Sequence, residues 1–150
     1  MVAPSLSVWI IVGVSPEQAF EAVADPAILS RYFTTGGAEG RMESGQTVTW
    51  DFADFPGRFA VDIDEAVAPE RIRFHWGGDK PEHFRTQVAF AFEPLDGGKR
   101  TKVKVSESGW PDGETGRGDS YSKCMGWSQM LAAMKAWVEH GINLREGAYK

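Results

Sequence analysis

The sequence contains one cysteine, Cys124, so no disulfide can form within the chain. It also lacks an excess of basic residues, because 16 Lys and Arg are outnumbered by 21 Asp and Glu, which gives a formal net charge of -5. Nucleic acids and anionic membrane surfaces are bound through basic faces. We therefore expect neither of them as the main partner.

Long hydrophobic runs are missing as well. The apolar stretch VWIIVGV at 8–14 is too short to span a bilayer, and no basic segment precedes it as in a secretory signal. Together with the single cysteine, this predicts a cytoplasmic, reducing setting and no membrane association. A chain of 150 residues is predicted to form one domain, residues 1–150, which can bury most of its apolar surface.

Histidine is scarce, with His75, His83 and His140 as its three positions. No pair of them has the spacing of zinc ligands, and one cysteine cannot complete a ligand set. We therefore predict no metal site and no cofactor. Cys124 has no histidine placed by sequence to activate its thiol, so we interpret it as a small buried residue and not as a nucleophile.

Aromatic residues are abundant, with six Trp and nine Phe, and many of them alternate with polar residues. A first strand is expected at 5–14. From Gly36 onward, period-two alternation predicts about six further strands with one apolar face. They are GGAEGRM, QTVTWDF, GRFAVDIDEAV, RIRFHW, TQVAFAFEP and RTKVKVSES, separated by turn sequences that include GGDKPE at 77–82.

Helix signals flank these strands. Ser15 and Asp25 are each followed by proline, the pattern of an N-cap and a first helical residue, and predict two short helices after the first strand. A long helix is expected from about Ser120 to His140, after a polar loop at 110–119 and with Asp119 or Ser120 as its N-cap. Strands and helices that are segregated along the chain indicate an α+β fold in two layers.

One face of the long helix is apolar and has to cover the aromatic face of the sheet. Such a pair of layers can pack solidly or can enclose a cavity. Periodicity alone favours a solid core, since apolar stripes at helical spacing are usually core residues.

A resemblance to a known family changes this balance. The strings VSPEQAFEAVADPAILSRYF, APERIRFHW, TQVAFAFEPLDGGKRTKVKVSESGWP and the final GW…L…MKAWVEHG are similar to the SRPBCC (START-like, helix-grip) superfamily. Within it, they resemble the branch named after the activator of the heat-shock-protein-ninety ATPase. The resemblance implies a curved antiparallel sheet of about six or seven strands that grips the C-terminal helix, with a cavity between them for a lipophilic small molecule.

Carried over by position, the resemblance also implies which residues contact the ligand. The cavity wall would consist of Trp50, Phe59, Val61, Phe74, Trp76, Phe90, Phe92, Trp127, Met130 and Met134. Glu107 is added to these ligand-binding residues because of the alternation in its own strand. Tyr32, Phe33 and Trp110 would lie at the entrance.

Glu107 is the polar residue of most interest. Alternation with Val103 and Val105 predicts that its side chain points inward at the end of a strand. A carboxylate at the edge of an apolar cavity can act as an acid or base or can orient a polar ligand group. The alternative is that the strand has already ended and that Glu107 is solvated.

We expect a small protein that binds a hydrophobic or amphipathic molecule, as a monomer or homodimer, and that is not a catalyst, since no set of acid, base and nucleophile emerges. A co-chaperone-type domain that binds a chaperone ATPase or another protein is the first alternative. The second is an enzyme of the cyclase or hydrolase type that uses Glu107, with Tyr32 or Tyr121 in support.

Overall fold

The computed structural model describes residues 2–78 and 83–150, and consists of a sheet, two short helices and one long helix. Most of the predicted turn at 77–82 therefore lies outside the described residues. The elements are β1 (Leu6–Val12), α1 (Pro16–Ala24), α2 (Pro26–Tyr32), β2 (Gly37–Glu39), β3 (Thr47–Phe52), β4 (Phe55–Val67), β5 (Arg71–Trp76), β6 (Thr86–Leu95), a 3-10 turn (Asp96–Gly98), β7 (Arg100–Ser108) and α3 (Glu114–His140).

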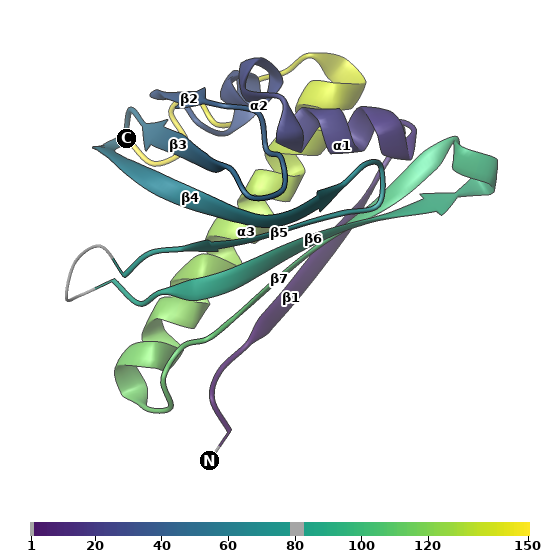
Figure 1. The fold of residues 1–150 in the computed structure, drawn as a ribbon. Helices are drawn as coiled ribbons and strands as arrows, with labels where there is room; N and C mark the ends of the chain where they lie inside the picture. The colour runs from purple at the N-terminus through teal and green to yellow at the C-terminus, as the bar shows by residue number, and fades with distance from the viewer. Residues whose placement is uncertain (1, 79–82) are drawn as a thin grey trace.

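The sheet has seven antiparallel strands in the order β1-β7-β6-β5-β4-β3-β2. Figure 1 shows the curved sheet with α3 lying across one face and with α1 and α2 near one end of that helix. This confirms the predicted α+β fold, in which the sheet grips the C-terminal helix. The predicted strand at 36–42 is shorter than expected, because only Gly37–Glu39 pairs with β3.

Both short helices begin where the sequence predicts. The Ser15 side chain accepts a hydrogen bond from the backbone of Gln18 at 3.2 Å, and the Gln18 side chain accepts one from the backbone of Ser15 at 3.3 Å. This reciprocal pair is a capping box, which satisfies two backbone donors that a helix start leaves free. Asp25 caps α2 in a similar way, with its carboxylate accepting from the backbone of Ala27 at 2.9 Å.

The start of α3 differs from the prediction. The helix begins at Glu114 with Gly113 as its N-cap, so most of the expected loop at 110–119 is helical. Neither Asp119 nor Ser120 is the N-cap. Asp119 instead accepts a hydrogen bond from the indole nitrogen of Trp110 at 2.6 Å, and this tertiary contact holds a glycine-rich stretch in helical form that local propensity disfavours.

The apolar face of the sheet and the apolar stripe of α3 form one core. Trp127 lies in the middle of it, with its ring 5.4 Å from that of Trp76 and 5.6 Å from that of Phe90, measured between centroids. Phe33, which ends α2, packs 5.9 Å from Trp127 and 5.6 Å from Trp50 of β3. Phe33 therefore joins the two layers at the α2 end of the core.

A polar clamp fixes the other side of α3 to the edge strand β1. The ammonium of Lys135 donates to the backbone carbonyl of Ile11 at 2.7 Å and pairs with Glu139 at 2.5 Å. Glu139 in turn accepts from the backbone nitrogen of Gly13 at 3.0 Å. These contacts satisfy backbone groups at the sheet edge and set the position of the helix along β1.

Candidate functional site

The residues predicted to line a cavity are packed against one another in the interior. Trp50, Val61, Phe74, Phe90, Phe92, Trp127 and Met134 are buried, and Phe59 and Trp76 are half-buried at the rim of the cluster. Aromatic rings from four strands and three helical segments contact each other at centroid distances of 5.0 to 6.4 Å, with edge-on, tilted and stacked geometries. The structure thus brings these residues together as a continuous aromatic cluster.

Glu107 lies inside this cluster. Its side chain is 1% exposed, as the alternation in β7 predicts. One carboxylate oxygen accepts from the indole nitrogen of Trp127 at 2.7 Å. The other accepts from the hydroxyl of Thr86 at 2.6 Å and from the indole nitrogen of Trp76 at 3.1 Å. Three donors from two strands and α3 therefore meet on one carboxylate, which compensates for its removal from water.

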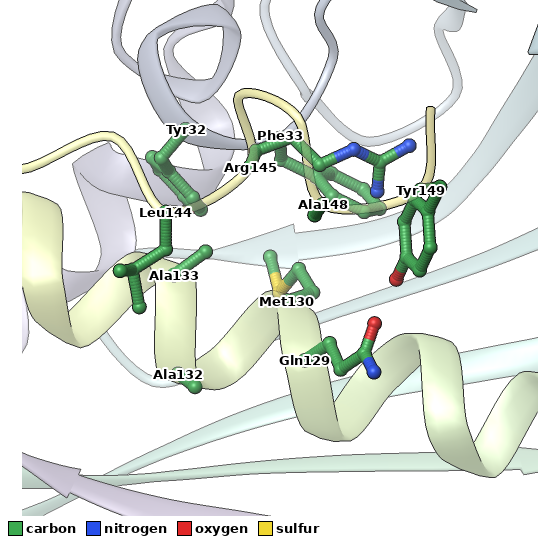
Figure 2. A pocket seen from close by; sticks show the side chains of 10 residues that line it. All are labelled: Tyr32, Phe33, Gln129, Met130, Ala132, Ala133, Leu144, Arg145, Ala148 and Tyr149. Carbon is green, nitrogen blue, oxygen red and sulfur yellow. The ribbon is translucent and has the colours of Figure 1, made fainter. Parts of the chain in front are cut away.

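A pocket of about 260 Å³ opens beside the aromatic cluster, where residues 142–150 fold back over α2 and α3. We call it the tail pocket, and Figure 2 shows its side chains. Three predicted residues, Tyr32, Phe33 and Met130, take part in its walls. The full lining is Tyr32, Phe33, Gln129, Met130, Ala132, Ala133, Leu144, Arg145, Ala148 and Tyr149.

Arg145 is the one charged residue among these ten. Its guanidinium donates to Asp54 at 2.9 Å and lies over the rings of Tyr149 and Phe52, 4.5 and 5.0 Å from their centroids. The side chain is 10% exposed. Within the described residues, its Nε atom is buried without a hydrogen-bond partner. Arginine thus anchors the tail while leaving part of its donor capacity unused.

A second cavity, of about 450 Å³, lies between α1 and the C-terminal end of α3. Trp137 and Val138 of α3 form part of its wall. Glu17 and Glu21 lie at its edge, and Glu21 is paired with Arg41 at 2.6 Å, which lowers the pKa of the Glu21 carboxyl. We call it the α1 groove.

The three predicted entrance residues do not lie together. Tyr32 and Phe33 line the tail pocket, and burial raises the pKa of the Tyr32 phenol, whose hydroxyl donates to the carbonyl of Ala22 at 2.8 Å. Trp110 instead packs against the first turns of α3 and is 2% exposed. Asp119, the hydrogen-bond partner of Trp110, lies eleven positions before Met130 in α3. This offset corresponds to a rise of about 16 Å along the helix axis.

Several lining residues were missed at the sequence level. Arg145 and Tyr149 belong to INLREGAYK, the segment that follows the end of the long helix. The only sequence signal in this segment is that apolar residues recur at intervals among polar ones.

Cys124 is half-buried and not fully buried as expected. Across residues 2–78 and 83–150, no group of three or more His, Cys, Asp or Glu side chains is placed to hold a metal ion. Of the helices in that part of the chain, none is long and apolar enough to cross a membrane.

Comparison with known proteins identifies the family. Residues 13–139 match the family described as "Activator of Hsp90 ATPase homolog 1-like protein". The chain belongs to this family. The match covers α1, α2, strands β2 to β7 and α3 up to its penultimate residue, leaves out β1, and ends before the residues of the tail that line the pocket. No curated protein matches the sequence.

Several solved structures share this fold. The protein SSP2350 from Staphylococcus saprophyticus is 23% identical with a TM-score of 0.79, over 95% of this chain and 96% of that one. The Aha1 dimer from Colwellia psychrerythraea is 19% identical with a TM-score of 0.78, over 92% and 98%. DynU16, from the dynemicin biosynthetic locus, is 22% identical with a TM-score of 0.75, over 91% of this chain and 48% of that one. At these identities, the likeness shows the shared fold.

Proposed function

We propose that this member of the family binds a hydrophobic or amphipathic small molecule in the tail pocket. The observation that supports this is the pocket itself, about 260 Å³, with apolar walls and a few polar groups. Small-molecule sites have this composition and are typically about 300–1,000 Å³. The ligand would therefore be small, or it would protrude through the open side of the pocket.

In this proposal, the predicted wall residues of the aromatic cluster lie behind the residues that line the tail pocket. Phe33 separates the tail pocket from Trp50 and Trp127, and its ring contacts both of them. A ligand would reach these two tryptophans once the Phe33 ring turned aside. Met130 lies on the pocket side and would contact the ligand directly.

The enzymatic alternative has less support. Glu107 is not among the described residues that line the tail pocket or the α1 groove, and its two oxygens already accept three hydrogen bonds. A general acid or base must reach the proton that it transfers. We interpret Glu107 as a structural residue whose hydrogen bonds join α3 to the sheet.

A co-chaperone role is the alternative suggested by the family description. Its structural support is the likeness to the Aha1 dimer, which at 19% identity shows the fold. We place it second because the tail pocket gives small-molecule binding a defined location among the described residues.

Thermal-shift screening tests the proposal. Small lipophiles, both neutral and charged, are added to the wild-type protein and to two alanine-to-leucine variants of α3. Ala133→Leu places a larger side chain in the pocket lining, whereas Ala136→Leu makes the same change outside that lining. A ligand that binds the native state raises the melting temperature by mass action.

The expected result is a rise in melting temperature of the wild type and of Ala136→Leu, and none for Ala133→Leu. The proposal fails if no lipophile shifts the wild type, or if Ala133→Leu responds as strongly as Ala136→Leu.

A further inference from the structure

We propose that the molecule bound in the tail pocket carries a single carboxylate, which is held by Arg145. This inference rests on the proposed function and adds to it the chemical class of the ligand. It uses the polarity of the pocket, the partial pairing of Arg145 and the charge of Asp54.

The polar groups of the tail pocket lie at one end. Figure 2 shows the guanidinium of Arg145 extending toward Tyr149, and the hydroxyl of Tyr149 directed toward the amide of Gln129. Leu144 and Ala133 lie together at the other end. A ligand with one polar head and a short apolar body matches this division, with its head between the arginine and the two neutral polar groups.

The head group is inferred from donor capacity. A guanidinium has five N–H donors and no acceptor. One contact, from Nη2 to Asp54, is its side-chain hydrogen bond to the described residues, so further N–H groups on the two terminal nitrogens remain for a ligand. Unused donors on a mostly buried cation favour an acceptor that also carries negative charge, and a carboxylate matches the planar fork of arginine.

The number of charges on the ligand follows from Asp54. Its carboxylate, 15% exposed, already neutralises part of the arginine charge at 2.9 Å. A dianionic group such as a phosphate monoester would be repelled by Asp54 at this short range, whereas a monoanion meets less repulsion. Asp54 is therefore a competitor for Arg145, and its charge limits how tightly the ligand is held.

The test compares acids with alcohols of the same shape. Dissociation constants of hexanoate and 1-hexanol, and of phenylacetate and 2-phenylethanol, are measured by isothermal titration calorimetry on the full chain. We expect each acid to bind at least about tenfold more tightly than its alcohol, because a carboxylate adds an opposite charge and a second acceptor oxygen, whereas the alcohol offers the guanidinium one uncharged acceptor.

Three variants assign the effect to Arg145. Arg145→Gln should weaken binding of hexanoate about tenfold or more and change that of 1-hexanol less than twofold. Asp54→Asn keeps an acceptor for the arginine and removes the competing charge, so hexanoate should bind several-fold more tightly. Arg58→Gln makes the same charge change on an exposed residue outside the pocket lining and should leave both constants unchanged.

The outcomes separate this inference from the proposed function. Equal binding of acid and alcohol would overturn the carboxylate assignment and leave small-molecule binding intact. If Arg145→Gln weakened both ligands equally, Arg145 would act only by anchoring the tail, and the inference would be wrong. Unchanged hexanoate binding by Asp54→Asn would also overturn it. If neither acid nor alcohol bound, and Ala133→Leu behaved as the wild type toward every lipophile, the proposed function itself would fail.

Discussion

The indole nitrogen of Trp127, in the middle of α3, donates a hydrogen bond to the carboxylate of Glu107 near the end of β7 at 2.7 Å. Both side chains are almost completely buried. The contact therefore joins the long helix to the sheet through a polar bond inside an aromatic core. Where water is excluded, removing one partner of such a hydrogen bond is costly, because the other partner stays buried and unsatisfied.

Replacing Glu107 by Gln should destabilise the fold by about 1–3 kcal/mol. The amide keeps one acceptor but introduces an NH2 group, which must face at least one of the indole or hydroxyl donors that now meet the carboxylate. Urea unfolding followed by tryptophan fluorescence measures the change. Glu93→Gln, on an exposed position of β6, is the control and should stay within about 0.5 kcal/mol of the wild type. A neutral outcome for Glu107→Gln would show that the bonds to its carboxylate contribute little.

Two glycines of α3 should respond in opposite directions to alanine. A Cβ at Gly116 would lie 2.1 Å from the backbone carbonyl oxygen of Pro111, so Gly116→Ala should cost about 1–3 kcal/mol through overpacking. A Cβ at Gly126 meets no atom within 4 Å, so Gly126→Ala should stabilise the helix by about 0.5–1 kcal/mol. Chemical denaturation of both variants checks this. A Gly116→Ala protein as stable as the wild type would disprove the close approach.

Stability should depend on pH through Glu139. Its hydrogen bond with Lys135 lowers the pKa of the Glu139 carboxyl, and the backbone N–H of Gly13 lowers it further. The folded-state pKa therefore lies below the unfolded value of about 4.3. The stabilisation of the fold by the charged Glu139 carboxylate is complete above that pH and is lost as the pH falls through the folded-state pKa. Glu139→Gln should therefore cost about 1 kcal/mol at pH 7 and progressively less as the solution is acidified.

The measurement for Glu139 is the free energy of unfolding in urea at several pH values from 7 to about 3. Glu146→Gln, at an exposed position of the tail, serves as the control. A difference between Glu139→Gln and the wild type that stayed constant over this range would mean that the clamp does not depend on the charge of Glu139.

The hydroxyl of Tyr32 should matter for stability and that of Tyr121 should not. Tyr32 is completely buried and donates to the backbone carbonyl of Ala22, whereas Tyr121 is 72% exposed. Tyr32→Phe removes that bond and should cost about 1–2 kcal/mol. Tyr121→Phe should change the free energy of unfolding by less than about 0.5 kcal/mol. Thermal and urea unfolding of the two variants would refute the interpretation if the costs were equal.

The sequence by itself determined the fold class and most of the element order. Period-two alternation fixed which residues of the strands face the core, including Glu107, because side chains of a strand alternate strictly between its two faces. Ser15 and Asp25 fixed the starts of α1 and α2, because their caps are formed with residues two or three positions away. Local chemistry is sufficient wherever the deciding contacts are close in sequence.

Only the tertiary structure decided where α3 begins and where the tail pocket lies. Gly113 starts the helix because Trp110 and Pro111 pack against its first turns, a contact that propensity does not encode. The tail pocket lies where the tail passes over Phe33, and Arg145 of the tail contacts Asp54, 91 residues away along the chain. Contacts between segments so distant in sequence depend on the packing of the whole chain, so no local pattern could place them.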